Sequence, residues 1–299
     1  MTSPQQTPKT VTSTARTLSI VTAVVGGGAL LAVAFSSAFG PIQARISSLT
    51  DVGSTGPAAN SINEPQVAWT DDTLSVPVDE VQSLRVDAEA VTFDLAFGDV
   101  ENAELTVEYS ATRGSGAEWS MHVEGRTLVA ERLDGPNFGP NVGEERVKLV
   151  LPQWLSEDGG IAAELTVSAA TLTAEGDFSE LSAGVEAGKL KYSGSTPAID
   201  LEVSGGKAQI DAGDVRTADI VVEAGDAQLA FTGDQPDSVD VEASVGKAVL
   251  ELPKGAYRVE ASAEVGAVDN QLTVDESSQH RVQASAEAAR IVLRETSRG

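Results

Sequence analysis

Residues 199–224 read IDLEVSGGKAQIDAGDVRTADIVVEA and contain the same pattern of apolar and polar residues twice. In residues 199–205 every second residue is apolar or glycine, and the residues between them are polar. A similar alternation returns 19 residues later, in residues 218–224. Alternation with a period of two is typical of a strand that buries one side. Two such strands at a fixed interval predict a structure built from repeats.

The repeat extends over the second half of the chain, where the alternation returns every 18 to 21 residues from Ala163 onward. Each unit could bury its apolar side only against its neighbours. We therefore predict an all-β fold, a β-solenoid or β-helix-like stack of 18–21-residue coils that begins at Ile161. A β-sandwich also alternates, but it has no reason to keep a near-constant interval. The looser copies Val259–Val268 and Val282–Leu293 are expected to be terminal caps. The predicted central file of the core is Val167, Val185, Val203, Val222 and Val241.

Residues 76–151 are predicted to form a leading series of strands separated by turns that contain glycine. Residues 134–143, DGPNFGPNVG, give the strongest loop signal, because Gly, Pro and Asn interrupt a strand ladder. The predicted strands are Leu84–Ala88, Val91–Leu95, Leu105–Tyr109, Trp119–Val123, Thr127–Ala130 and Arg146–Leu151.

The N-terminal part of the chain contains a candidate membrane anchor. Leu18–Phe39 has no charged residue and as a helix would be roughly 33 Å long, enough for a bilayer core of about 30 Å. Lys9 and Arg16 precede it, which places the N-terminus in the cytoplasm. We predict a cytoplasmic tail (1–17), a transmembrane helix (18–39), a flexible linker (40–65) and an extracytoplasmic domain (66–299). A cleaved signal peptide is the alternative, although its apolar core would be unusually long.

Composition limits the classes of function. The formal net charge of −25, from 20 basic and 45 acidic residues, repels phosphate backbones and argues against nucleic acid as a partner. Cysteine is absent, which excludes disulfides, thiolate metal sites and cysteine nucleophiles. Aromatic residues make up only 4% of the chain, so the core must be built from Val, Ala, Leu and Ile.

The sequence shows no set of catalytic residues. The chain has two histidines, His122 and His280, and neither lies in a recognisable nucleophile, metal or phosphate motif. A glycosidase needs two carboxyl groups about 5–10 Å apart in a cleft, whereas the acids here are scattered over exposed positions. Tryptophan platforms for sugars are scarce, and Trp154, after Pro152, is predicted to be a packing cover. We therefore predict no enzyme activity and no catalytic, cofactor-binding or metal-binding residues.

Stacked carboxylates are the one feature that could bind a cation. Asp200 and Asp219 are predicted to occupy one outward column, and Glu186, Glu223 and Glu242 another, with Ser204 interrupting. Coils lie about 4.8 Å apart, so such carboxylates repel one another unless solvent and salt screen them or Ca²⁺ or Mg²⁺ bridges them. No calcium-loop motif is present, so screening is the expectation and calcium the weaker alternative. Lys207, Asp226 and Lys247 are expected to form a ladder of alternating charge.

These features together resemble a known family. An N-terminal anchor, a strand-rich leading region, the edge Leu149–Pro152 and recurring V-x-A/G-G-K/D-A/L steps are similar to the bacterial "putative adhesin" β-strand-repeat proteins, whose toastrack-type domain has no established function. The resemblance covers Val76–Leu293 and implies a β-solenoid with a role at the cell surface. It transfers no catalytic residue. The sequence departs from the family pattern where relatives often have Gly-Asp, at Lys189, Lys207 and Lys247, and at a two-residue expansion around Val245.

The expected function is therefore binding or display at the cell envelope, through a sheet face or the loop 134–143. The expected partners are the membrane, through the N-terminal helix, and a cell-wall glycan or an envelope protein. An accessory or regulatory role in envelope-stress signalling is the alternative, and a polysaccharide-acting enzyme is a weaker one.

Overall fold

The computed structural model describes residues 68–70, 73–109, 119–133, 145–157 and 160–296. These residues form an all-β structure with a large many-stranded sheet, as predicted. The predicted membrane helix 18–39 and the loop 134–143 lie outside the described residues. Within those residues no helix has the length and apolarity needed to cross a bilayer.

The described part of the chain consists almost entirely of strands, with a 3-10 turn at Gln153–Ser156. The strands are β1 Ala68–Thr70, β2 Thr73–Val76, β3 Ser83–Glu89, β4 Thr92–Gly98, β5 Ala103–Tyr109, β6 Trp119–Glu124, β7 Thr127–Arg132, β8 Glu145–Pro152, β9 Ile161–Glu175, β10 Phe178–Ser195, β11 Ala198–Val203, β12 Lys207–Gly213, β13 Thr217–Thr232, β14 Ser238–Leu252, β15 Ala256–Ala263, β16 Ala267–Asn270, β17 Thr273–Val274 and β18 Arg281–Glu295.

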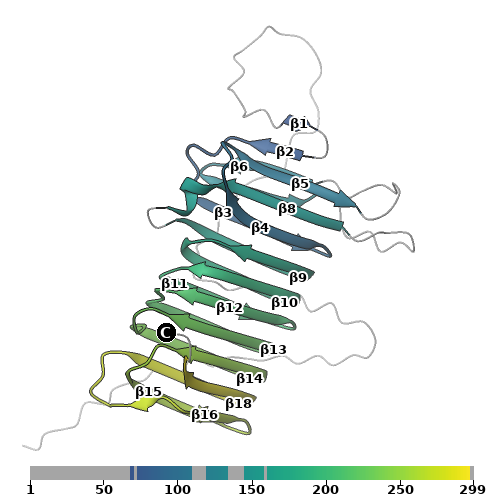
Figure 1. The fold of residues 1–299 in the computed structure, drawn as a ribbon. Helices are drawn as coiled ribbons and strands as arrows, with labels where there is room; N and C mark the ends of the chain where they lie inside the picture. Colours follow the sequence, from purple (N-terminus) through teal and green to yellow (C-terminus); the bar gives the residue numbers. More distant parts are fainter. Residues whose placement is uncertain (1–67, 71–72, 110–118, 134–144, 158–159, 297–299) are drawn as a thin grey trace, which may run out of the picture. The chain divides into compact units, whose positions relative to one another are not determined.

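Successive coils pair in parallel along two faces. On one face lie β3, β11, β15 and the N-terminal halves of β9, β10, β13, β14 and β18. On the other face lie β4, β12, β16 and the C-terminal halves of the same five long strands. Figure 1 shows this second face as a ladder from β4 to β16. Neighbouring coils thus pair in parallel, whereas the strands of an antiparallel β-sandwich do not.

The central file of the core confirms most of the predicted register. Val167, Val185, Val203 and Val222 are consecutive partners across β9, β10, β11 and β13. The next partner, however, is Ala243, whereas the sequence pattern pointed to Val241.

The physical reason for this shift is a longer turn. Gly233–Asp237, before β14, has two residues more than the preceding turn, Asp214–Arg216. The extra residues therefore lie there and not around Val245, which pairs with Ala224 without a shift.

Glycines mark the bend between the two faces because consecutive coils approach closely there. A Cβ on Gly206 would lie 2.6 Å from the carbonyl oxygen of Gly188, and one on Gly225 would lie 2.5 Å from that of Gly206. Neither Gly206 nor Gly225 has a positive φ. Close backbone contact, and not an unusual dihedral, is thus why glycine recurs at these two positions.

The parallel stack begins earlier in the chain than Ile161. Strands β3 and β4 pair in parallel with the two halves of β9, so residues 83–98 form a coil of the same stack. Beyond them, β7 and β8 continue the two faces in parallel. The hairpin partner β6 pairs with β7, and β5 pairs with β8, both antiparallel. All six strands predicted between residues 84 and 151 are present, but the sequence did not show that two of them belong to the repeat.

The C-terminal strand does not form a terminal cap. Strand β18 lies between β14 and the coil of β15 and β16, with which it pairs on its other side. It is in full register with β14 and buries Ile291 and Leu293. The outer coil, in contrast, has the exposed residues Ala261, Ala263 and Asn270 at the equivalent inward positions. The coil with the smaller and more polar residues thus covers the end of the stack, where it loses least by exposure.

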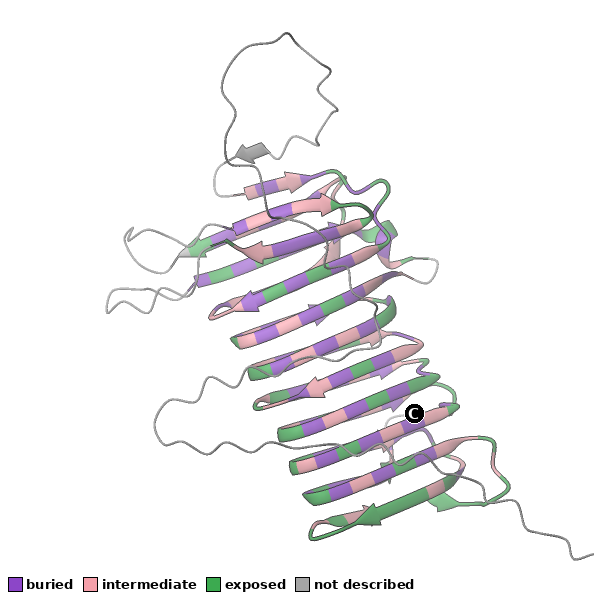
Figure 2. Ribbon diagram, turned by 180° about the vertical axis from the view of Figure 1, so that it is seen from behind, coloured by how far each residue is buried: buried purple, intermediate pink, exposed green. Residues whose placement is uncertain are grey.

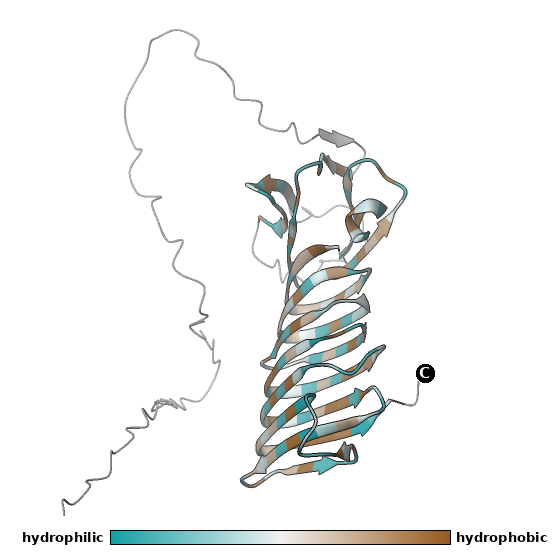
Figure 3. Cartoon of the chain, turned by 90° about the vertical axis from the view of Figure 1, so that its left-hand side faces the viewer, coloured by the Kyte–Doolittle hydropathy of each residue, from teal (hydrophilic) through white to brown (hydrophobic). Residues whose placement is uncertain are grey.

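The core is a continuous set of apolar files between the two faces. Buried and more exposed residues alternate along every long strand (Figure 2), and apolar residues alternate with polar ones in the same way (Figure 3). Aromatic rings fill the corner where the coils leave the second face: Phe178 contacts Phe97 and Tyr192, with ring centroids 5.8 and 5.7 Å apart. The Tyr192 hydroxyl donates to the carbonyl oxygen of Gly176 or of Ser195, which lie 3.1 and 3.0 Å away.

Candidate functional site

The outward side of the first face is strongly acidic. The segments that form it from β9 to β14 are residues 161–168, 178–187, 198–205, 217–224 and 238–245, and they contain no Lys, Arg or His. We call this surface the acidic face. Its carboxylates are Glu164, Glu180, Glu186, Asp200, Glu202, Asp219, Glu223, Asp240 and Glu242.

Arginines border the acidic face at both ends. Arg85 Nε lies 2.9 Å from Glu164 Oε2, and Arg281 Nη2 lies 3.2 Å from Asp240 Oδ2. Asp200 and Asp219 are partners on neighbouring strands, which confirms the predicted column, and Asp240 continues it. The other predicted column is wrong in one member. Glu242 pairs with Val221, in the column of Glu202, because of the shift at β14.

Proximity and burial disfavour ionisation along this column. Partial desolvation, followed by the charges of Asp200 and Asp240, raises the pKa of Asp219. Desolvation and then the charge of Glu180 raise the pKa of Asp200. For Glu202 the pKa is raised by desolvation first and then by Glu223. Desolvation first, and neighbouring negative charges second, thus disfavour the ionised form of these carboxylates.

The raised pKa of Asp219 predicts a pH-dependent effect of Asp219→Asn. A folded-state pKa raised above the unfolded value of about 3.9 contributes stability below that value and loses it as pH rises through the folded pKa. We therefore expect Asp219→Asn to increase the free energy of unfolding at pH 7, by less than about 1 kcal/mol because solvent screens the charges. The gain should shrink as pH falls toward 4.

Urea unfolding of the full chain at pH 7 and pH 4.5 measures this effect. Asp226→Asn is the matched control, because Asp226 Oδ2 lies 3.4 Å from Lys207 Nζ on the opposite face. It should not increase stability at pH 7. An Asp219→Asn gain that is absent at pH 7, or that grows at low pH, would contradict the raised pKa.

The structure also allows a search for clusters of possible metal ligands. In the ranges that the structure describes, no group of three or more His, Asp or Glu side chains is placed to hold a metal ion. The two histidines are also far apart in the strand order, since His122 lies in β6 and His280 directly precedes β18. His280 Nδ1 donates to the carbonyl oxygen of Pro236 at 2.9 Å, and His122 Nδ1 lies 3.1 Å from Ser120 Oγ. The structure does not bring the histidines together.

The opposite face, which we call the mixed face, carries balanced charges. From β9 to β14 its segments, residues 170–175, 189–195, 207–213, 226–232 and 247–252, contain four lysines and four acids. Lys207, Asp226 and Lys247 are consecutive partners, which confirms the predicted ladder. The basic residues are Lys189, Lys191, Lys207 and Lys247, and the acidic ones are Glu175, Asp211, Asp226 and Glu251.

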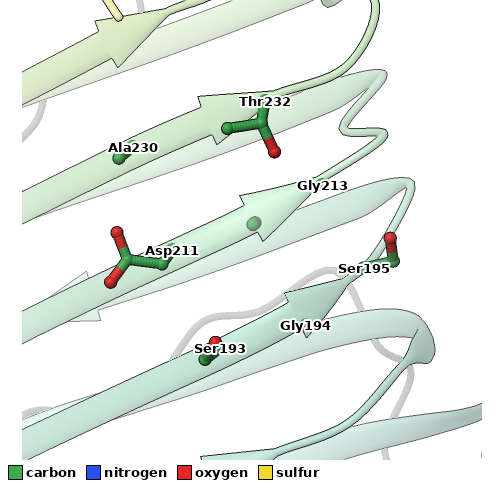
Figure 4. Close-up of a pocket in the computed structure, with 8 residues that line it drawn as sticks. Ser193, Gly194, Ser195, Asp211, Gly213, Ala230 and Thr232 are labelled. Carbon is green, nitrogen blue, oxygen red and sulfur yellow. The ribbon is translucent and has the colours of Figure 1, made fainter. Parts of the chain in front are cut away.

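A shallow groove of about 350 Å³ lies at the edge of the mixed face, where β10, β12 and β13 end (Figure 4). Two serines, an aspartate and a threonine provide its polar groups. Small residues provide the rest of the surface, so the neighbouring strands leave a depression between the polar side chains. The groove is lined by Ser193, Gly194, Ser195, Asp211, Ala212, Gly213, Ala230 and Thr232.

Sequence reasoning missed this groove. It depends on lateral neighbours, because Ser193, Asp211 and Ala230 share one column, and Ser195, Gly213 and Thr232 share another. The available signal was the recurrence of small residues at these repeat positions. Trp154, predicted to be a packing cover, has an exposed fraction of 46%, whereas the next residue, Leu155, is 3% exposed.

Comparison with known proteins gives similar structures only. No family model and no curated protein sequence matches this chain. Among solved structures, a "putative cell adhesion protein" from Clostridium sporogenes is 15% identical, with 78% of this chain and 100% of that chain covered and a TM-score of 0.33. A "putative adhesin" from Parabacteroides distasonis is 12% identical, with 74% and 95% covered and a TM-score of 0.43. Another, from Bacteroides fragilis, is 10% identical, with the same coverage and a TM-score of 0.31. The second and third of these structures carry the "putative adhesin" name of the family that the sequence resembles.

Proposed function

We propose that this chain is a non-enzymatic protein of the cell envelope, anchored by residues 18–39. Its extracytoplasmic β-solenoid binds a ligand or presents a surface outside the cell, in the manner of an adhesin. The anchor places the protein in the cell membrane as a single-pass protein with a cytoplasmic N-terminus. The observation that carries the proposal is the pair of long, polar sheet faces, which no other described element covers. Repeat proteins use such extended surfaces for binding.

The distribution of charge supports binding rather than catalysis. The acidic face concentrates carboxylates on a flat, repeating surface, while the groove lies on the opposite face. A glycosidase would need paired carboxyl groups across a cleft. The groove contains one carboxylate, Asp211, among hydroxyl groups and small residues. The proposed activity therefore needs neither a catalytic residue nor a cofactor.

A second candidate function is that of an accessory partner of another envelope protein. The acidic face favours it, since a basic surface would relieve the repulsion around Asp200 and Asp219. Such an interaction should weaken as ionic strength rises, because salt screens exposed charges. Binding to a neutral glycan, in contrast, should not weaken as ionic strength rises.

Two binding assays with components of the cell envelope test the proposal. Tagged full-length chain, solubilised from membranes, is incubated in one assay with purified cell-wall sacculi. In a second assay it is incubated with solubilised membrane proteins and then cross-linked to those that it binds. We expect retention on sacculi that is little changed by added salt. Capture of one specific membrane protein, released by salt, would favour the accessory role. Turnover of any member of a polysaccharide panel by the chain would contradict both.

A further inference from the structure

Polar groups form a continuous line along the corner where the coils leave the mixed face. Ser156 Oγ accepts from the backbone N–H of Asp177 at 3.0 Å, and Asp177 Oδ1 accepts from that of Ser195 at 2.7 Å. Ser195 Oγ donates to Asp214 Oδ2 at 3.2 Å. These bonds connect the 3-10 turn to three successive coils. The line holds hydroxyl and carboxylate oxygens in fixed positions, one coil after another.

The groove adjoins this line at Ser195. Ser195 belongs to both, and Ser193, Asp211 and Thr232 project from three neighbouring strands around the depression (Figure 4). Gln209 Nε2 lies 3.4 Å from Asp211 Oδ2, so an amide adjoins the carboxylate. The small residues Gly213 and Ala230 leave room between these groups. Such a surface can both donate hydrogen bonds to a ligand and accept them from it.

An exposed aromatic side chain stands at the other end of the line. Trp154 belongs to the same 3-10 turn as Ser156, and nearly half of its surface is open to solvent. Leu155 anchors this turn in the core, which fixes the position from which the indole projects. The flat indole ring offers an apolar surface that suits the apolar face of a ring-shaped ligand. The turn that carries Trp154 is thus linked to the groove through the hydrogen bonds from Ser156 to Ser195, and the indole and the groove offer two different kinds of contact.

Charge and spacing select the class of ligand. The mixed face is locally neutral, but a chain with a net charge of −25 repels polyanions. Neighbouring coils lie about 4.8 Å apart, so successive coils offer hydrogen-bonding groups at a short, regular spacing that a linear chain of sugar rings can follow. We propose that the edge from Trp154 through Ser195 to Thr232 binds a neutral, linear glycan, with a sugar ring on the indole and hydroxyl groups in the groove. This inference rests on the proposed surface role and names its ligand class and site.

Calorimetric titration of the full chain in detergent with chitohexaose and with cellohexaose, two neutral linear hexamers, tests the inference. We expect saturable binding to at least one hexamer, unchanged between low and high salt. Trp154→Ala removes the ring contact, and Ala230→Arg fills the groove from β13. Each should weaken binding at least tenfold, and Trp154→Phe should retain part of the affinity. Thr217→Arg, an equivalent change at an exposed position of β13 on the acidic face, should bind as the wild type does.

Circular dichroism confirms that each variant is folded before titration. Binding that Trp154→Ala and Ala230→Arg leave unchanged, or no saturable binding of either hexamer by the wild type, overturns the inference. Retention of the wild type on cell-wall sacculi in that case still supports the proposed surface role. Failure of both assays contradicts the role itself, so the two failures are distinguishable.

Discussion

Ile220→Ala is expected to lower the free energy of unfolding by about 2–5 kcal/mol, the usual cost of removing a large buried aliphatic side chain. Ile220 is fully buried in β13 and lies between Leu201 of β11 and Val241 of β14. A cavity at this position would interrupt the apolar file on both sides. Since each coil is stabilised mainly by its two neighbours, little else can compensate for the loss.

The adjacent residue provides the control. Val221 is on the same strand but faces outward, in the column of Glu202 and Glu242. Val221→Ala should cost less than about 1 kcal/mol, the range of strand propensity. Urea unfolding of both variants in the full chain, followed by circular dichroism, measures the difference. Equal losses for the two variants would mean that Ile220 does not lie in a packed file.

Glu145→Gln is expected to destabilise the N-terminal end of the stack by about 3–5 kcal/mol, because it leaves a buried charge without its partner. Glu145 Oε2 lies 3.4 Å from Arg132 Nη2, and both side chains are 5% exposed. Trp119 Nε1 also donates to Glu145, and Arg132 Nη1 donates to the carbonyl oxygen of Glu89 at 3.1 Å. Glutamine keeps an acceptor for Trp119 but cannot balance the charge of Arg132.

An exposed ion pair provides the comparison for this variant. Arg85 and Glu164 have side chains that are 48% and 56% exposed. Glu164→Gln should therefore cost no more than about 1 kcal/mol. Thermal and urea unfolding of the two variants at pH 7 give the two values. A loss for Glu145→Gln no larger than that for Glu164→Gln would show that water reaches the buried pair.

The register could be predicted only as far as the turns keep a constant length. Val185, Val203 and Val222 follow at intervals of 18 and 19 residues, and the structure pairs them as predicted. At β14 the alternation offers Val239, Val241 and Ala243 as equally plausible members of the file. A shift by two residues keeps the same side of the strand buried, so local pattern cannot distinguish these choices. The length of the turn Gly233–Asp237 decides the register.

The position of β18 could not be read from the chain order. Its alternation, with Val282 and Ala284 inward, is equivalent to that of Val259 and Ala261 in β15. Either strand could continue the stack after β14. Strand β18 occupies the inner position because burial of its Ile291 and Leu293 contributes more free energy than burial of smaller or more polar residues. Their partners on β16 are Val268 and Asn270.

By itself, the sequence determined that this chain is all-β, that its coils repeat at 18 to 21 residues and that its outward positions are acidic, since these properties follow from local alternation and composition. The tertiary structure alone decided the separation of charge between two faces, the coil formed by residues 83–98, the inner position of β18 and the groove beside Ser195. Each of these depends on which coil lies beside which. That choice is set by turn lengths and by the burial gained at each level of the stack, and neither is encoded in the period of the repeat.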